Sequence, residues 1–195
     1  MPPTTKSELR HRLLARRDAL DPETIAHCSA RIHRRLFALD VFRRARAVAF
    51  FVATRSEVRT LPMIQEALAS GRRVVVPRTI LEDRSLRLKE IRHPDADLAP
   101  GTLGILEPAA GAPEVPVSEV DLFIVPGAVW DRRGYRIGYG GGFYDRLLVQ
   151  SPDTPRVGLA FELQVVNRLP EQAHDTPVDW LVTERRVYRF SRPGR

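Results

Sequence analysis

The chain opens with two stretches in which apolar residues recur at helical spacing. The stretch from Thr5 to Glu8 is typical of a capping box, because the Thr5 hydroxyl can accept from the amide of Glu8 while Glu8 reaches back. Asp21 followed by Pro22 marks the start of a second helix, with the aspartate as cap and the proline in the first turn. The apolar stripe of this second helix comprises Ile25, Cys28, Ile32, Leu36 and Leu39. Two helices are therefore predicted before residue 40.

After residue 46 the pattern changes to short, continuous apolar runs, which are typical of strands covered on both faces. Such strands are predicted over residues 47–52, 74–77, 121–127, 156–161 and 180–184, with an edge strand over 86–91 and a further strand over 187–190. Helices over 60–70 and 143–150 lie between them, and residues 93–120 form a long, proline-rich irregular connection.

Strands that alternate with helices predict an α/β fold of three layers (αβα), in which a largely parallel sheet carries helices on both faces. We expect residues 1–195 to form a single domain. Because ligands of such sheets bind beyond the carboxyl ends of the strands, the loops after residues 52, 77, 125 and 161 are the expected binding region.

Composition narrows the class of protein. The sequence has 31 Lys and Arg against 24 Asp and Glu, a net charge of +7, which favours either an anionic partner or simply an arginine-rich surface. The basic residues do not gather in one block.

No run of 18 apolar residues exists, the N-terminal residues are polar, and Cys28 is the single cysteine, so we expect a protein of the reducing cytoplasm with no membrane span.

The segment from Arg136 to Asp145 carries the clearest chemistry. Four glycines within residues 138–142 let the backbone approach a ligand closely, and Arg136 can supply a full charge to a phosphate. The segment lacks the lysine of a Walker loop and the glycine spacing of a dinucleotide fingerprint. It is therefore a candidate phosphate cradle, the alternative being a turn without a ligand. Asp145, with Asp175 as a second carboxylate, is a candidate Mg²⁺ ligand, although either is equally compatible with an ordinary loop acid.

Several separated segments resemble the 5-formyltetrahydrofolate cyclo-ligases, also called 5,10-methenyltetrahydrofolate synthetases. They run in order along nearly the whole chain: Lys6-x-x-Leu9-Arg10, AVAFFV with SEVRT (47–52 and 56–60), VVVP with GILEP (74–77 and 104–108), VPGAVWDRRGYRIGYGGGFYDRLL (125–148) and LPEQAHDTPVDWLVTE (169–184). The glycine-rich segment is the most specific. Phe143 replaces a common tyrosine of the family, and Trp130 stands where phenylalanine is usual.

The resemblance implies an ATP- and Mg²⁺-dependent ring closure that converts 5-formyltetrahydrofolate to 5,10-methenyltetrahydrofolate and releases ADP and phosphate. It implies phosphoryl transfer to the formyl oxygen, followed by attack of N10. It also implies a sheet architecture resembling sugar-phosphate isomerases and coenzyme A transferases. No side-chain nucleophile is needed, which fits a sequence without a convincing nucleophile–base set.

Carried over by position, the resemblance implies four groups of residues. ATP would contact Lys6, Ser7, Glu8, Leu9 and Arg10, together with Arg136, Ile137, Gly138, Tyr139, Gly140, Gly141, Gly142, Phe143 and Tyr144. The folate would contact Val52, Glu57, Tyr139, Gly140, Gly141, Gly142 and Phe143. The catalytic set would be Arg136, Tyr144 and Asp145, and Mg²⁺ would be held by Asp145 and Asp175.

Two other functions stay open on the residues alone. An isomerase of the same architecture would turn over a sugar phosphate without nucleotide. A basic nucleic-acid-binding protein would bind duplex DNA with a steep salt dependence, but the sequence shows no recognised motif for it. We expect ATP and a reduced folate, with or without a polyglutamate tail, as partners, no nucleic acid or membrane, and a monomer.

Overall fold

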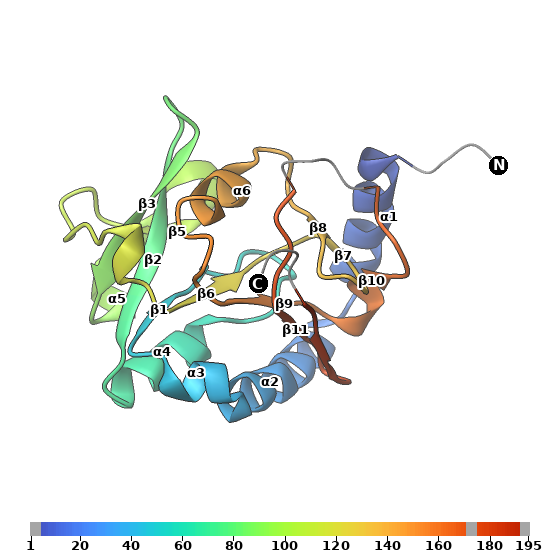
Figure 1. The fold of residues 1–195 in the computed structure, drawn as a ribbon, viewed down its shortest axis with the longest axis horizontal. Helices are drawn as coiled ribbons and strands as arrows, with labels where there is room; N and C mark the ends of the chain where they lie inside the picture. Colours follow the sequence, from blue (N-terminus) through green and yellow to red (C-terminus); the bar gives the residue numbers. More distant parts are fainter. Residues whose placement is uncertain (1–4, 171–174, 192–195) are drawn as a thin grey trace.

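A seven-stranded sheet forms the centre of the computed structural model, which describes residues 5–170 and 175–191 (Figure 1). Its order is β12-β11-β9-β6-β1-β2-β3, and the five inner strands run parallel. Both edge strands are antiparallel to their neighbours. The strands are β1 (Ala47–Ala49), β2 (Arg73–Ile80), β3 (Ser85–Ile91), β6 (Leu122–Val125), β9 (Arg156–Leu159), β11 (Trp180–Val182) and β12 (Val187–Arg189). The predicted largely parallel α/β fold is confirmed, including the edge position of residues 86–91.

Three helices cover one face of this sheet: α2 (Pro22–Ala38), α3 (Asp40–Arg44) and α4 (Leu61–Ala69) (Figure 1). The predicted Asp21 cap of α2 is present, since its Oδ1 accepts from the amide of Thr24 at 2.7 Å. Ile32 and Leu36 of the predicted stripe are fully buried, and Cys28 packs half-buried beside them. Their contacts with alternate residues of the strands form the larger core cluster, as a strand's period of two requires.

The opposite face is covered by α6 (Phe143–Leu148) and by a small sheet in the order β10-β7-β8. Its strands are β10 (Val165–Val166), β7 (Val129–Asp131) and β8 (Arg136–Ile137), none of which the local pattern predicted. Trp130 is fully buried between the two sheets. A β-carbon on Gly158 would lie 2.4 Å from its ring, so the close approach of β9 to Trp130 requires glycine there.

Helix α1 (Lys6–Asp18) packs on the small sheet instead of the large one (Figure 1). Its capping box is confirmed, since the Glu8 amide donates to the Thr5 hydroxyl and the Thr5 amide donates to the Glu8 carboxylate. Leu9 and Leu13 contact the cluster that holds Val129 and Ile137. The first helix is therefore fixed beside β8, the strand that leads into the glycine-rich segment.

Several predicted elements differ in length from those observed: residues 121–127, 156–161 and 180–184 form shorter strands, 74–77 a longer strand and 143–150 a shorter helix. Two differences are larger. The apolar run 47–52 forms a strand only as far as Ala49, because beyond that residue pairing to β6 ends and the chain turns towards α4. Residues 93–120 are not irregular throughout. They contain α5 (Pro94–Asp97), a two-stranded sheet of β4 (Leu98–Pro100) and β5 (Leu106–Pro108), and 3₁₀ turns over 102–104 and 117–119; a third 3₁₀ turn covers 162–164.

No helix that the structure describes combines the length and the apolar character that a bilayer span needs.

Candidate active site

The glycine-rich segment links β8 to α6 at the surface of the molecule. Gly140 has a φ of +104° and Gly142, the residue before α6, a φ of +65°, so both occupy backbone conformations that favour glycine. Helix α6 has only six residues, so its dipole is short and the charge of the site must come mainly from side chains. The segment is thus shaped to present backbone, as a phosphate cradle requires.

One cation of α1 lies over this segment. Arg10 Nη1 is 3.6 Å from the position that a β-carbon on Gly140 would occupy. Lys6, one turn earlier in the helix, pairs instead with Asp175: its Nζ lies 2.5 Å from Asp175 Oδ2, which joins the first turn of the helix to the loop before β11. The structure therefore brings Arg10 beside the glycine-rich segment and Lys6 beside the candidate metal ligand Asp175.

The buried Arg136 guanidinium joins one candidate metal ligand to the backbone beside the other. Its Nη2 lies 3.0 Å from Asp145 Oδ1, and its Nη1 donates to the carbonyl of Thr176, the residue after Asp175, at 3.0 Å. Asp145 is thus paired with Arg136, and Asp175 is paired with Lys6.

Carboxylate oxygens are suitable ligands for Mg²⁺, which takes one or two carboxylates and completes its shell with phosphate oxygens and water. Within residues 5–170 and 175–191 no group of three or more metal-binding side chains exists. Asp145 and Asp175 therefore suit a metal shared with a phosphate ligand better than a metal held in a protein cage.

A second polar cluster adjoins the glycine-rich segment. Glu57, only 6% exposed, lies beyond the carboxyl end of β1, where the sequence placed a ligand site. The Tyr139 hydroxyl donates to its Oε1 at 2.5 Å, and the amide of Thr54 donates to its Oε2 at 2.9 Å. Burial raises the pKa of the Glu57 carboxyl, against the lowering effect of these hydrogen bonds and of Arg17.

Burial also raises the pKa of the Tyr139 and Tyr144 hydroxyls, and the nearby Glu57 charge raises both further. Both phenols are therefore protonated at neutral pH. Tyr144 packs against the clusters on both faces of the sheet, which fixes the start of α6.

Arg17 belongs to this cluster and was missed by sequence reasoning. It is 3% exposed, donates through Nη1 to the Tyr139 hydroxyl at 3.0 Å, and donates through Nε to Ser56 Oγ at 3.0 Å. A signal was present, because Leu9, Leu13 and Arg17 follow one another at intervals of four along one helix face. An arginine that continues an apolar stripe is a candidate for a buried, partnered role.

Some predicted contact residues have their side chains engaged elsewhere. Leu9 and Ile137 are buried in the cluster between α1 and the small sheet, and Val52 is buried in the larger core. Glu8 caps α1, and Ser7 lies within 3.5 Å of His11. The Phe143 ring lies under the guanidinium of Arg146. These residues are left with mainly their backbone or one side-chain face for a ligand. Residues 171–174 of the last motif lie outside the described residues.

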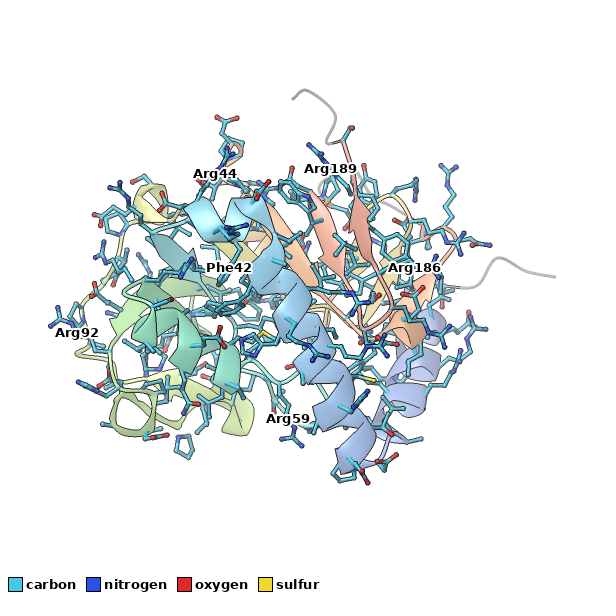
Figure 2. All side chains as sticks on the ribbon, turned by 90° about the horizontal axis from the view of Figure 1, so that it is seen from below. Phe42, Arg44, Arg59, Arg92, Arg186 and Arg189 are labelled. Atoms are coloured by element: carbon cyan, nitrogen blue, oxygen red, sulfur yellow. The ribbon has the colours of Figure 1, made fainter. Side chains whose placement is uncertain are left out.

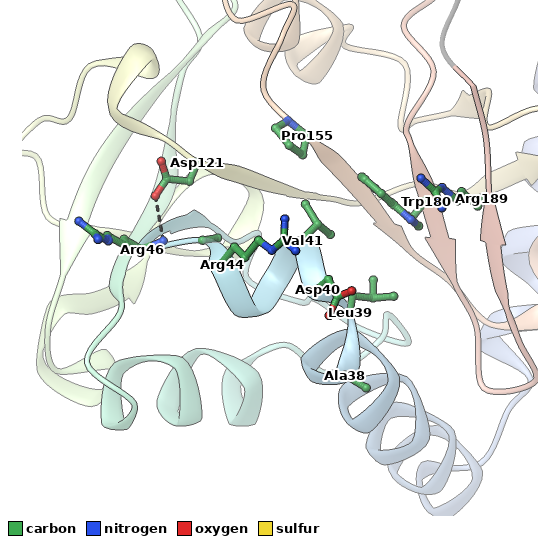
Figure 3. A pocket seen from close by; sticks show the side chains of 11 residues that line it. Ala38, Leu39, Asp40, Val41, Arg44, Arg46, Asp121, Pro155, Trp180 and Arg189 are labelled. Atoms are coloured by element: carbon green, nitrogen blue, oxygen red, sulfur yellow. Dashed lines mark hydrogen bonds between the residues drawn. The ribbon is translucent and has the colours of Figure 1, made fainter. Parts of the chain in front are cut away.

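A cavity of about 920 Å³ lies elsewhere, with Arg44, Trp180 and Arg189 around it (Figure 3). Its lining includes Asp121 and Pro155, which precede β6 and β9, so it opens at the amino ends of the parallel strands. Ligands of such sheets bind at the opposite ends, where the glycine-rich segment and Glu57 meet. We therefore do not place the active site in this cavity.

Among the described residues, the arginines labelled in one view are spread apart. Figure 2 shows Arg44, Arg59, Arg92 and Arg186 at separate positions around one face. Several arginines are paired with acids, as in the contacts of Arg73 with Glu90 and Glu119. This distribution does not suit a continuous nucleic-acid track.

Comparison of the sequence and the structure with those of known proteins identifies the family of this chain. Residues 3–184 match the model of the 5-formyltetrahydrofolate cyclo-ligase family. A 5-formyltetrahydrofolate cyclo-ligase of Escherichia coli K12 is 33% identical over 178 residues, which cover 90% of this chain and 98% of the relative. The solved structure of Aquifex aeolicus 5,10-methenyltetrahydrofolate synthetase is 37% identical with a TM-score of 0.85, covering 97% of this chain and 94% of that one. The Mycoplasma pneumoniae 5,10-methenyltetrahydrofolate synthetase, 22% identical with a TM-score of 0.74 over 92% and 98% of the two chains, shares the fold.

Proposed function

The chain belongs to the 5-formyltetrahydrofolate cyclo-ligase family, and on this premise we propose that it closes 5-formyltetrahydrofolate to 5,10-methenyltetrahydrofolate at the expense of ATP. The observation that carries the proposal is that Arg10 lies over the glycine-rich segment while two further cations pair with the candidate metal ligands, Arg136 with Asp145 and Lys6 with Asp175. Beside them lies the buried carboxylate of Glu57. A polyphosphate and a donor-rich ring would each find complementary groups at adjoining positions.

The chemistry requires activation of a poor electrophile. The formyl oxygen of the substrate attacks the γ-phosphorus of ATP, the bond to the β-phosphate oxygen breaks, and ADP leaves. N10 then attacks the activated formyl carbon and loses its proton, and the carbon–oxygen bond breaks to release phosphate. Such phosphoryl transfer depends chiefly on positioning and electrostatic stabilisation, which requires no protein nucleophile.

The cations have separate tasks in this proposal. Lys6 and Arg10 bind phosphate oxygens from the side of α1, while Arg136 binds them from beneath the glycine-rich segment. A planar guanidinium suits phosphate oxygens, and Arg136 is held in place by the Thr176 carbonyl. Tyr144 anchors the start of α6 and so holds Asp145 near these groups.

Asp145 and Asp175 would hold Mg²⁺, which supplies charge neutralisation of the phosphate oxygens when it is bound. Phosphate oxygens compete with these carboxylates for Lys6 and Arg136. Binding of ATP would therefore free both carboxylates from their present cations.

The folate is proposed to bind beside Glu57, near Val52 and residues 139–143. The amino and ring N–H groups of a pterin are donors, and a buried carboxylate that accepts from them fixes the ring's orientation. A substrate without these donors adds no hydrogen bond to this desolvated carboxylate and should therefore bind more weakly. ATP and the reduced folate are the partners we propose for a single-domain monomer.

The test is a spectroscopic assay. The purified protein, incubated with 5-formyltetrahydrofolate, ATP and Mg²⁺, should generate the near-ultraviolet absorbance of methenyltetrahydrofolate, and omission of ATP should abolish it. Folded protein that gives no product under these conditions contradicts the proposal. Turnover of a sugar phosphate without nucleotide would instead favour an isomerase.

A further inference from the structure

A chain of hydrogen bonds that starts at Arg17 runs through the proposed site. Arg17 Nη1 donates to the Tyr139 hydroxyl at 3.0 Å, and that hydroxyl donates to Glu57 Oε1 at 2.5 Å. The direction is fixed by chemistry, because a guanidinium has donors but no acceptor and a carboxylate has acceptors but no donor. The single hydroxyl proton of Tyr139 therefore points to Glu57, and its lone pair receives Arg17.

The chain joins three separate parts of the fold. Arg17 lies in the last turn of α1, Tyr139 lies in the glycine-rich segment, and Glu57 lies in the connection after β1. Arg17 also donates through Nε to Ser56 Oγ, the neighbour of Glu57, and Ser56 contacts Asp18. One buried guanidinium thus contacts both segments that flank the proposed folate position.

The exposure of the three partners differs in a way that suits a positioning role. Arg17 and Glu57 are 3% and 6% exposed, whereas Tyr139 is 52% exposed. Hence about half of Tyr139 is open to a ligand, while its hydroxyl is held by Arg17 and Glu57 and the Arg17 guanidinium lies over the ring, 6.0 Å from the centroid. Because Tyr139 is flanked by Gly138 and Gly140, its position depends strongly on these contacts.

We propose that Arg17 is a positioning residue for folate binding, which acts by holding Tyr139 against Glu57. In this way Arg17 sets, before substrate arrives, the separation between the glycine-rich segment and the Glu57 carboxylate that is proposed to bind the pterin. The inference rests on the proposed function for the identity of the ligand. It predicts that Arg17 contributes to folate affinity and not to the chemical step, because the hydrogen bonds of Arg17 go to Tyr139 and Ser56 and neither takes part in the proposed bond-making steps.

The experiment is a double-mutant cycle of Arg17→Met and Tyr139→Phe, read by steady-state kinetics. Each single variant should raise KM for 5-formyltetrahydrofolate about tenfold, with kcat changed less than about twofold. The double variant should be no worse than either single one, since both remove the same link. Arg17→Lys, which keeps a donor towards Tyr139, should lie between Arg17→Met and the wild type. Arg16→Met, an exposed neighbour on the same helix, is the matched control and should behave as wild type.

A second measurement is independent of turnover. Hydrogen exchange of amides in residues 136–145 should be faster in Arg17→Met and Tyr139→Phe than in the wild type, and unchanged in Arg16→Met. An unchanged KM in either variant, or single effects that multiply in the double variant, overturns the inference. If Arg17→Met does not fold, Tyr139→Phe decides by the same KM and exchange criteria. A wild type that forms no product contradicts the proposed function, and the exchange data alone then decide whether Arg17 holds the segment.

Discussion

Replacing Gly140 by alanine tests whether the backbone conformation of the glycine-rich segment matters for ATP. A β-carbon at this position would meet the Arg10 guanidinium, with Nη1 at 3.6 Å and Cζ at 4.0 Å, which are ordinary contacts, and no other group of the described residues within 4 Å. Steric clash is therefore not expected, and the effect of the substitution comes from the backbone. Its φ of +104° lies in a region that residues other than glycine rarely adopt, at a cost of about 1–3 kcal/mol.

Because the segment is exposed, it can relieve that strain by moving to a different conformation in the free protein. The strain then reappears when ATP requires the original conformation. A cost of about 1–3 kcal/mol corresponds to a loss of about 5-fold to 150-fold in kcat/KM for ATP. The free energy of unfolding should fall by less than this cost, since the free protein escapes part of the strain.

Gly104→Ala is the matched control. Gly104 has a φ of +75° and lies between β4 and β5, and a β-carbon added to it would meet no other group within 4 Å. Its substitution should lower the free energy of unfolding, measured with urea, and leave kcat/KM for ATP unchanged. The reasoning is refuted if folded Gly140→Ala retains a kcat/KM for ATP within about twofold of the wild type, or if Gly104→Ala loses as much.

Three further predictions concern separate parts of the molecule. Asp145→Asn should lower turnover at least tenfold, or about 1.4 kcal/mol of barrier, whereas the exposed Asp95→Asn should not; wild-type rates for Asp145→Asn across Mg²⁺ concentrations would reject the metal role. Burial raises the pKa of the Glu57 carboxyl in the folded protein above its ordinary 4.5, so the folded protein holds the carboxyl proton more tightly than the unfolded chain does. The free energy of unfolding of the wild type therefore falls as pH rises from the unfolded pKa to the folded pKa. Glu57→Gln removes this dependence. The free energy of unfolding of Glu57→Gln relative to that of the wild type, measured with urea, should therefore rise with pH through that window, and a difference that stays constant contradicts the raised pKa of Glu57. Leu13→Ala, at a position 2% exposed between α1 and the small sheet, should lower the free energy of unfolding by about 2–5 kcal/mol, and a loss below about 1 kcal/mol would show that α1 is not held by this contact.

The elements that the sequence predicted are those whose signals are local. The Thr5–Glu8 capping box and the Asp21 cap each depend on residues three apart, and both are present. The continuous apolar runs of the inner strands are also local signals, because each run by itself indicates a strand that is buried on both faces. These signals suffice for the order of layers, which follows from the alternation of strands and helices.

The small sheet could not be predicted in the same way. Its strands have two or three residues, and β10 pairs with β7 across a long separation, as in the register of Val165 with Trp130. Runs this short have no readable period, and their strand conformation depends on partners that the local pattern does not contain. For the same reason the sequence did not place α1 on the small sheet.

The candidate site was predicted in part, residue by residue. The motif resemblance indicated Lys6, Arg136 and Asp145; in the structure Arg136 pairs with Asp145, and Lys6 pairs with Asp175. It did not indicate Arg17, whose partners lie 39 and 122 positions away along the chain. It also did not separate side-chain roles from backbone ones, so Leu9 and Val52 entered the site although their side chains are core.

The pairing of Lys6 with Asp175 joins residues 169 positions apart. During synthesis, the nascent chain therefore cannot form this ion pair until residue 175 has emerged from the ribosome. Products truncated before Asp175 would retain the glycine-rich segment and α1 but lack β11, β12 and one carboxylate. Under the proposed function, ATP affinity should therefore appear only after residue 175 has been synthesised and has folded back onto α1.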